Sequence, residues 1–388
     1  MAPEVAWKEL PESSPPLRVL DPMAGSGTTL VTARLRGHKA IGFDRDPLAV
    51  LISGTWVSNV NTEVVISKAE EVLKRARILA LTYKSKKGKA FPKNADQETK
   101  DFIRFWFDDT NRTQLAALSQ TISRLHDPAL RNLMWCAFSR LIITKKVGVS
   151  LAMDVSHSRP HRKYIVAPIQ AFDHFIRSVK QLVKGSPFSG KVQKEPKATV
   201  KNADARRLPL KANSIDMVIT SPPYLNAIDY IRGHKLSLVW MGYSISKLRI
   251  LRGTNIGTES VTKDQNDQAT NDVMKNMCRG ADLSTRNTGI LRQYVQDTKG
   301  ILSEIYRVLR PSGKAVIVVG NCNIRETFVK NSRGIEIVAK QVGLTVHKIR
   351  KRRLPENRRY LPPPTHSGAG KALQKRMREE VILTLLKL

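Results

Sequence analysis

The pattern of apolar residues predicts two strands that both end in turns. Ile215–Thr220 is a nearly continuous run of Ile, Met and Val, and it stops at Ser221–Tyr224, which reads Ser-Pro-Pro-Tyr. Prolines cannot donate to a sheet, so this run is typical of a central strand buried on both faces. A second short apolar run, Leu17–Leu20, leads into the glycine turn Gly25–Gly27. In open α/β sheets, ligands bind at the carboxyl edge where such strands end.

Further strands and helices follow in alternation. Lys39–Asp44 predicts a strand at βαβ distance from the first, and Ala198–Ala203 and Ala315–Val319 predict two more. Apolar residues three and four positions apart predict helices at 64–81, 114–125, 130–141, 294–309 and 334–342. The expected fold is therefore α/β, with a doubly wound and mostly parallel sheet.

A long interruption separates the second strand from the third. Between Pro47 and about Lys197 the chain has roughly 150 residues, longer than a loop of a compact domain, and much of it has helical spacing. We therefore expect a large helical insertion. The predicted organisation is residues 1–49 as the first part of the sheet domain, 50–197 as the insertion, and 198–388 as the second part. The lead-in 1–16 is polar, and 245–290 is expected to be a polar loop.

Composition favours a polyanionic partner. Lys and Arg number 66 against 33 Asp and Glu, a net charge of +33. A membrane surface is the competing explanation, but no apolar run approaches the ~20 residues of a spanning helix, and the N-terminus does not resemble a signal peptide. Cys136, Cys278 and Cys322 are far apart and lack metal-ligand spacing, so a reducing cytoplasm is expected and a zinc site is not.

Cations gather in three segments. Lys84–Lys89 is a basic run that a solvated surface would explain equally well. Val155–Lys163 combines hydroxyls, His and Arg, and we predict phosphate contacts there from His157, Arg159, His161 and Arg162. The alternative is a metal pair of the two His, for which the segment 155–163 has no acidic or thiol partner. Lys348–Arg353, followed by Arg358 and Arg359, is expected to connect two strands and bind phosphate through Lys351, Arg352 and Arg353.

The two turns offer complementary chemistry. The Ser221 hydroxyl and the Pro222 carbonyl can both accept hydrogen bonds from one exocyclic amino group, and Tyr224 offers a face on which a base can stack. At the other turn, glycines allow close backbone approach, and a helix N-terminus favours an anionic group such as a carboxylate. Asp44 ends the next strand and suits ribose hydroxyls. The plainer alternatives are a Pro-rich turn, and a solvated loop or helix cap for Asp44 and Asp46.

These motifs carry a resemblance to a known family. Asp21–Thr29, Asp-Pro-Met-Ala-Gly-Ser-Gly-Thr-Thr, resembles the S-adenosylmethionine-binding motif of DNA amino-methyltransferases, and Ser221–Tyr224 resembles their catalytic motif in its cytosine-N4 form. The resemblance implies a class I methyltransferase sheet that ends in an antiparallel hairpin, here 344–347 with 381–386. The implied catalytic residues are Ser221, Pro222, Pro223 and Tyr224. The implied cofactor-binding residues are Asp21, Pro22, Met23, Ala24, Gly25, Ser26, Gly27, Thr28, Asp44 and Asp204.

The implied activity is methylation of the N4 atom of a flipped-out cytosine in double-stranded DNA, with S-adenosyl-L-methionine as the donor. None of the three cysteines follows a proline, so the nucleophile of cytosine-C5 methyltransferases is missing. Alternatives are adenine-N6 methylation, an RNA amino-methyltransferase, and a basic DNA-binding protein with an inactive methyltransferase fold. A cognate restriction endonuclease is an expected partner, and the protein is expected in the cytoplasm, at the nucleoid through DNA.

Overall fold

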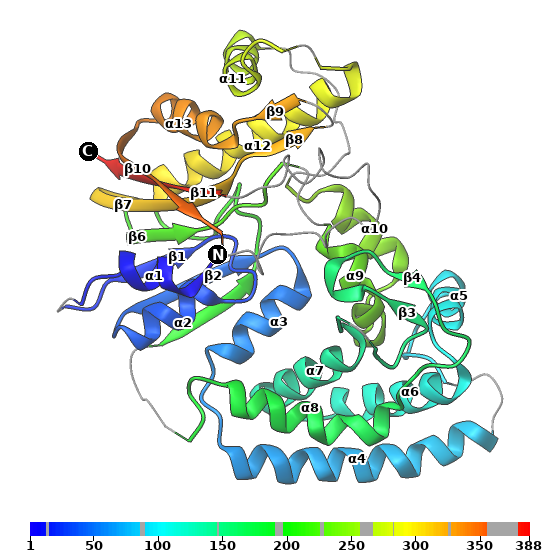
Figure 1. Cartoon of the computed structure of the whole chain (residues 1–388). Helices are drawn as coiled ribbons and strands as arrows, with labels where there is room; N and C mark the ends of the chain where they lie inside the picture. The colour runs from blue at the N-terminus through cyan, green and yellow to red at the C-terminus, as the bar shows by residue number, and fades with distance from the viewer. Residues whose placement is uncertain are drawn as a thin grey trace.

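A seven-stranded sheet with the order β10-β11-β7-β6-β1-β2-β5 forms the centre of the molecule (Figure 1). Its strands are β1 (Arg18–Asp21), β2 (Lys39–Asp44), β5 (Ala198–Asn202), β6 (Ile215–Thr220), β7 (Leu309–Gly320), β10 (Leu344–Arg353) and β11 (Glu379–Lys387). Six strands run in the same direction, and β11 lies antiparallel between β7 and β10. The computed structural model describes residues 1–12, 15–85, 90–145, 147–190, 197–225, 229–256, 267–281, 283–324, 327–354 and 379–388.

The predicted sheet is confirmed, because it is doubly wound, mostly parallel and closed by an antiparallel hairpin. Alternate residues of the strands enter different cores. Val19, Met217 and Ile219 pack on the face covered by α1 (Pro3–Glu9) and α2 (Thr28–Leu35). Leu20, Val218 and their neighbours pack on the opposite face, against α11 (Gln268–Cys278), α12 (Thr285–Val308) and α13 (Asn331–Gln341). Both faces are therefore buried, which explains the continuous apolar runs.

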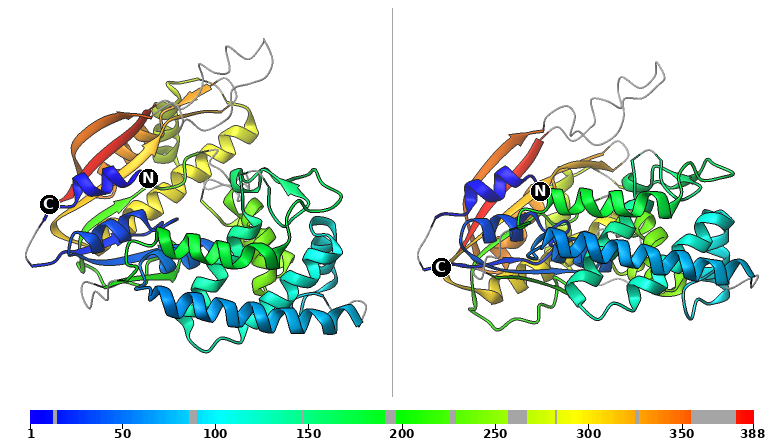
Figure 2. Two further views of the ribbon diagram at one scale, coloured as in Figure 1. Left: turned by 60° about the horizontal axis from the view of Figure 1, so that its bottom comes forward. Right: turned by 90° about the horizontal axis from the view of Figure 1, so that it is seen from below.

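A helical lobe with its own core stands beside the sheet (Figure 2). It contains α3 (Pro47–Trp56), α4 (Thr62–Ser85), α5 (Gln97–Trp106), α6 (Asp109–Ser123), α7 (Pro128–Ile142) and α8 (Ala171–Gly185). A later segment joins this core: α9 (Tyr230–Leu238), the 3-10 turn η2 (Val239–Met241) and α10 (Ile245–Gly253). Trp240 is fully buried there, edge-on to Phe107 at 5.3 Å, and its carbonyl accepts a 2.6 Å hydrogen bond from Ser119 Oγ. The segment after the Ser-Pro-Pro-Tyr turn thus ties the lobe to the sheet.

Several local predictions were wrong. The expected polar loop 245–290 contains α10, α11 and the start of α12, because Ser244 and Asp267 cap helices whose apolar residues pack inward. Part of the polar lead-in forms α1, which has a proline in its first turn. In the aromatic run 102–107, the side chains of Phe102, Trp106 and Phe107 pack inside the lobe. The basic run 86–89, Arg358 and Arg359 lie outside the described residues.

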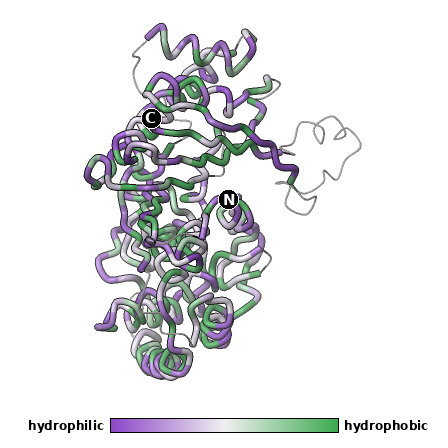
Figure 3. Tube along the Cα trace, turned by 90° about the vertical axis from the view of Figure 1, so that its left-hand side faces the viewer, coloured by the Kyte–Doolittle hydropathy of each residue, from purple (hydrophilic) through white to green (hydrophobic). Residues whose placement is uncertain are grey.

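Short hairpins complete the fold. In the lobe, β3 (Ala152–Met153) pairs with β4 (His161–Arg162) around the 3-10 turn η1 (Val155–His157), and β8 (Cys322–Ile324) pairs with β9 (Thr327–Val329) near the sheet. The chain trace in Figure 3 shows the end of the β10–β11 hairpin projecting from the body of the molecule. Among the residues described, no helix is both long and apolar enough to span a membrane.

Candidate active site

The glycine turn and the Ser-Pro-Pro-Tyr turn leave the sheet side by side. β1 and β6 are parallel neighbours, with Leu20 opposite Val218. At their ends Thr220 Oγ1 donates a 2.7 Å hydrogen bond to Asp21 Oδ1, and Thr29 Oγ1, in α2, donates to the Ile219 carbonyl at 3.1 Å. The two motifs are therefore joined at one edge of the sheet, although 199 positions separate Thr220 from Asp21.

Backbone geometry explains the glycines of the first turn. Gly25 and Gly27 have φ of 50° and 83°, in the left-handed region that other residues rarely adopt. A Cβ atom on Gly27 would lie 2.9 Å from Ser53 Cβ, so this glycine lets α2 and α3 approach. A Cβ on Gly25 would meet nothing within 4 Å. The turn is therefore open above Gly25, where its backbone could approach a ligand.

Asp44 is bound to the glycine turn by its own carboxylate. Asp44 Oδ2 accepts a 2.8 Å hydrogen bond from the Gly25 amide, and Oδ1 accepts one of 2.9 Å from the Asp46 amide. Burial raises the pKa of Asp44 to about 6, against the opposing effect of these hydrogen bonds. Burial also raises the pKa of Asp21. Two carboxyl groups with little solvent thus lie under the turn, which favours a ligand that brings hydroxyls or positive charge.

His234 was missed as a site residue in the sequence. It lies on α9, and its Nδ1 is 2.5 Å from Asp46 Oδ2, while Asp46 Oδ1 caps α3 by accepting from the Leu48 amide at 2.9 Å. Burial tends to lower the pKa of His234, but the charge and hydrogen bond of Asp46 outweigh it and the pKa is raised. The proposed alternative of a helix cap is correct for Asp46. The sequence signal for His234 was its place at the end of the run that follows Tyr224.

The second turn is connected to the last strand. Ser221 Oγ lies 3.4 Å from the Tyr224 hydroxyl, which donates to Glu380 Oε1 at 3.3 Å. Glu380, 7% exposed on β11, also accepts a 2.9 Å hydrogen bond from Arg352. Arg352 reaches Glu4 on α1 at 2.9 Å as well. The tip of the Tyr224 side chain is therefore tethered to β11, and Glu380 is a second residue that sequence reasoning missed.

A small apolar cavity lies under the Ser-Pro-Pro-Tyr turn. Both motifs contribute to it, together with the segment after α10 and the core on the α12 side. Its lining residues are Met23, Thr220, Pro222, Pro223, Ile256, Tyr294, Thr298, Ile301, Leu302, Ile317 and Ile335. Burial raises the pKa of the Tyr294 phenol, so this group stays neutral. Met23 and Pro222 thus face the same space, whose volume of about 10 Å³ has room for roughly one water.

The carboxylate of Asp204 pairs with two arginines in this structure. It accepts from Arg45 Nη1 at 2.9 Å and from Arg206 Nη2 at 2.7 Å, and Arg206 also pairs with buried Asp297 at 2.6 Å. Burial tends to raise the pKa of Asp204, but the hydrogen bonds from Arg206 and both positive charges lower it. Arg45 also donates to the Thr254 carbonyl at 2.8 Å. The network joins the ends of β2 and β5 to the end of α10, and the adenine contact of Asp204 stays a prediction.

The chain is similar to type II methyltransferases. It is 24% identical over 259 residues to M.BsoBI from Geobacillus stearothermophilus, which covers 60% of this chain and 49% of that protein. It is 22% identical over 330 residues to M.MvaI from Kocuria varians, which covers 79% of this chain and 71% of that protein. The chain thus spans about half the length of M.BsoBI.

Structural similarity is broad but distant. A solved S-adenosylmethionine-dependent methyltransferase from Methanosarcina mazei aligns over 100% of this chain and 98% of its own, with 8% identity and a TM-score of 0.34. No protein-family model matches the sequence. The fold assignment therefore depends on the strand order and directions described above.

The predicted phosphate contacts of the lobe lie next to α9. A Cβ on Gly233 would lie 2.5 Å from the Val155 carbonyl, so α9 packs directly on η1. His157 bonds to Asp154, and Arg162 lies over the Phe105 ring at 5.3 Å. Arg159 and His161 are in the same hairpin, and His161 is exposed. Within the described ranges, no three His, Cys, Asp or Glu residues are arranged to hold a metal ion.

The cationic segment Lys348–Arg353 lies in β10, and the prediction that it connects two strands was wrong. Residues 344–353 pair with β11 along their length, with one irregularity between Val346 and Lys348. Acidic residues neutralise part of the stripe: Arg350 pairs with Glu9, Arg352 with Glu4 and Glu380, and Lys351 with Glu379 at 3.9 Å. Lys351 and Arg353 are exposed, whereas Arg352 is half-buried. The partners of Arg352 favour a structural role for its guanidinium.

Proposed function

We propose that this chain binds S-adenosyl-L-methionine and methylates an exocyclic amino group of a base in double-stranded DNA, with cytosine N4 as the target atom. The observation that carries the proposal is the hydrogen bond between Thr220 and Asp21, because it holds the cofactor-type turn and the amino-acceptor turn at one edge of the sheet. Similarity to the two type II methyltransferases supports the same reaction class.

The residues of the first turn fit the cofactor. The open space above Gly25 and the N-terminus of α2 suit close approach of an amino-acid carboxylate, and Asp44, at the end of β2, suits the ribose hydroxyls. Asp21 supports the turn through Thr220 and the Met23 amide. We assign the contact surface to the stretch Asp21–Thr28. Asp204 contacts the adenine amino group in this proposal only if Arg45 or Arg206 yields one carboxylate oxygen.

The second turn would prepare the amino group. The bound cofactor supplies an electrophilic methyl group on a sulfonium. Ser221 Oγ and the Pro222 carbonyl accept the two amino hydrogens, which draws the nitrogen lone pair out of conjugation with the ring. With the cofactor bound, the nitrogen would take the methyl group as the sulfur leaves with the electron pair of the carbon–sulfur bond, and the cationic nitrogen would then release its surplus proton to solvent. Positioning by Ser221, Pro222 and Pro223 contributes most of the rate, while Tyr224 stacks on the base.

The target base must leave the duplex to reach this turn, because its amino group is otherwise paired and stacked, at a cost of a few kcal/mol. We assign phosphate contacts to His157, Arg159, His161 and Arg162 in the lobe and to Lys351 and Arg353 in β10. The net charge of +33 supports a polyanionic partner. A cognate restriction endonuclease and a cytoplasmic, nucleoid-associated location stay predictions.

Product analysis tests this proposal. The protein is incubated with methyl-labelled cofactor and, in separate reactions, genomic DNA and total RNA, which are then digested to nucleosides. The proposal predicts label in 4-methylcytosine from DNA. Label in 6-methyladenine would show that adenine N6 is the target atom, and label in RNA alone would show that RNA is the substrate. Cofactor binding without transfer to either polymer would favour an inactive DNA-binding protein.

A further inference from the structure

A chain of short contacts runs from α9 to the glycine turn. His234 Nδ1 meets Asp46 Oδ2 at 2.5 Å, the Asp46 amide donates to Asp44 Oδ1 at 2.9 Å, and the Gly25 amide donates to Asp44 Oδ2 at 2.8 Å. The two backbone contacts have ordinary hydrogen-bond distances, and the contact between His234 and Asp46 is shorter. His234 is the fifth residue of α9, a helix that begins at Tyr230, six positions after Tyr224. The contact therefore spans from the amino-acceptor side of the site to the cofactor side.

The charged groups around His234 explain the importance of its contact with Asp46. Asp44 and Asp46 face His234 from the end of β2, and Asp229 acts on it from the start of its own helix. Tyr230 packs beside the imidazole with ring centroids 6.0 Å apart, and the Lys235 ammonium is on the next position of α9. Two buried or half-buried carboxylates repel each other unless a cation lies between them or one is protonated. An imidazolium at His234 lies against Asp46 Oδ2 and offsets the negative charge of Asp46 that acts on Asp44.

We propose that His234 is a positioning residue for the cofactor: its imidazolium holds Asp46 and, through the Asp46 backbone, keeps Asp44 oriented as the ribose acceptor. This inference depends on the proposed function, because it assigns the ribose to Asp44. Neutral imidazole loses the charge that anchors Asp46, so cofactor affinity falls as the pH rises through the titration of His234. The methyl-transfer step itself does not use His234, so kcat at saturating cofactor stays nearly constant.

The test measures cofactor affinity by calorimetry between pH 6 and pH 9 on the full chain. His234→Asn can still hydrogen-bond but cannot become cationic, and it is expected to weaken binding about tenfold at pH 6.5 and to remove the wild-type fall above that pH. Asp46→Asn keeps a good helix cap and is expected to give the same loss. The double variant is expected to be no weaker than either single variant. His126→Asn, an exposed histidine of the lobe, is the matched control and is expected to match wild type.

Outcomes separate this inference from the proposed function. Wild-type affinity and pH dependence in His234→Asn, or additive losses in the double variant, would overturn the positioning role while leaving the methyltransferase proposal intact. Absence of cofactor binding by the wild-type chain would overturn the proposed function itself. A thermal unfolding scan of each variant shows whether the variant is folded. If His234→Asn has a folding defect, the cofactor affinity of Asp46→Asn tests the positioning role in its place.

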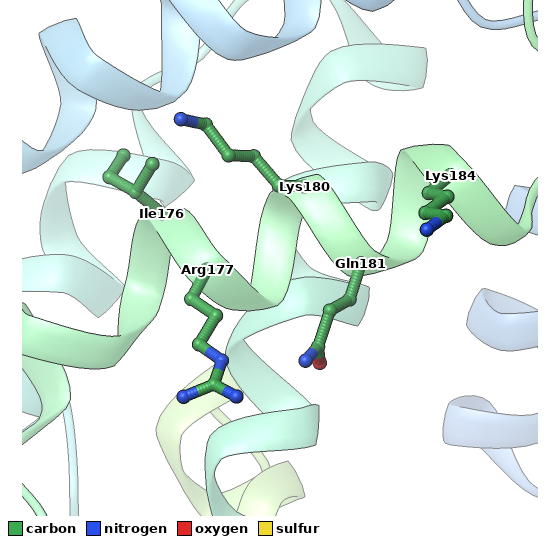
Figure 4. Close-up of a pocket in the computed structure, with 5 residues that line it drawn as sticks. All are labelled: Ile176, Arg177, Lys180, Gln181 and Lys184. Atoms are coloured by element: carbon green, nitrogen blue, oxygen red, sulfur yellow. The ribbon is translucent and has the colours of Figure 1, made fainter.

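A different observation points to a second surface, on α8. Ile176, Arg177, Lys180, Gln181 and Lys184 line a shallow groove on the outside of this helix, and their side chains extend away from the ribbon (Figure 4). The opposite face of α8 is buried through Phe175, Val179, Leu182 and Val183. Within the described residues, none of the three cations forms an ion pair. The helix therefore presents a row of uncompensated positive charge.

The position of these three cations on α8 would allow contact with a DNA duplex bound at the proposed site. The right-hand view of Figure 2 shows α8 on the same side of the molecule as the end of β10 and as the β3–β4 hairpin. On α8, Arg177 and Lys184 are seven residues apart, about 10 Å along the helix axis, a span that can contact successive phosphates of one strand. We infer that the α8 groove binds the DNA backbone and extends the contact away from the target base. This inference also depends on DNA being the substrate.

Salt-dependent binding tests the α8 surface. The triple variant Arg177→Gln, Lys180→Gln and Lys184→Gln is compared with Lys74→Gln, Arg77→Gln and Arg124→Gln, which removes the same charge from exposed positions on α4 and at the end of α6. The α8 variant is expected to flatten the slope of log affinity against log salt by about 2 to 3, and the control by less than about 1. Equal slopes in both variants would overturn the α8 surface. No binding of duplex DNA by wild type would instead overturn the proposed substrate.

Discussion

Thr220, the last residue of β6, donates a 2.7 Å hydrogen bond to Asp21, the last residue of β1, and both side chains are buried. Replacing Thr220 with Val keeps the shape of the side chain but removes the shorter of the two hydrogen bonds to Asp21 Oδ1, which keeps the Met23 amide at 3.2 Å. We expect the free energy of unfolding in urea to fall by about 1–3 kcal/mol, the contribution of one buried hydrogen bond to a carboxyl group. Thr82→Val, at an exposed position of α4, is the control and is expected to change it by less than about 0.5 kcal/mol. If Thr220→Val lowers the free energy of unfolding no more than Thr82→Val does, the hydrogen bond between Thr220 and Asp21 contributes little to stability.

Ser221→Ala separates catalysis from cofactor binding. The variant removes one acceptor for the amino group and leaves the glycine turn unchanged. We expect kcat to fall by about 10-fold to 100-fold, as expected for the loss of one strong hydrogen bond in the transition state, with an unchanged dissociation constant for the cofactor. Single-turnover methylation and calorimetry measure the two quantities. A variant with full kcat would remove Ser221 from the reaction.

Glu380 should act through Tyr224. Its carboxylate accepts from the Tyr224 hydroxyl at 3.3 Å and from Arg352 at 2.9 Å. We expect Glu380→Gln and Tyr224→Phe each to reduce kcat/KM for DNA several-fold while cofactor affinity is kept. Glu380→Gln removes the charge of the acceptor and Tyr224→Phe removes the donor, so both changes weaken the same contact and their effects should be less than additive in a double-mutant cycle. Strictly additive effects would mean that the two side chains act independently.

Protonation of Asp44 should limit cofactor binding at low pH. The pKa of Asp44 is raised by burial to about 6, and the ribose hydroxyls require the ionised carboxylate as acceptor. As the pH falls through about 6 the carboxylate gains a proton, so affinity should fall by up to tenfold per pH unit below that value. Calorimetry from pH 5 to pH 7 in buffers of different ionisation enthalpy would also show the released proton. Constant affinity across this range would remove Asp44 from the cofactor site.

The sequence alone predicted the elements whose residues are buried on both faces. The runs 215–220 and 39–44 became β6 and β2 at the predicted bounds, because a strand between two helical layers must be continuously apolar. The juxtaposition of the Asp21 and Ser221 turns also followed from strand order. These features depend on local pattern and on the general rule for parallel sheets.

Other features depend on contacts that no local pattern contains. Helices α10 and α11 are polar in sequence, and their few buried residues, such as Leu248 and Met277, find partners from distant segments. The partners of His234 and Arg352 lie 188 and 348 positions away, in Asp46 and Glu4. The cationic residues of β10 likewise resemble a phosphate site in the sequence, but in the fold Glu4 and Glu9 of α1 pair with Arg352 and Arg350. Long-range ion pairs of this kind require the folded chain.

A crystal structure of the chain with S-adenosyl-L-methionine bound tests the proposed site most directly. We expect the ribose hydroxyls to lie on Asp44, the methionine part to lie against the Gly25 turn, and the methyl group to point towards Ser221 and Pro222. A cofactor bound elsewhere, or one whose methyl group points away from the Ser-Pro-Pro-Tyr turn, would contradict it.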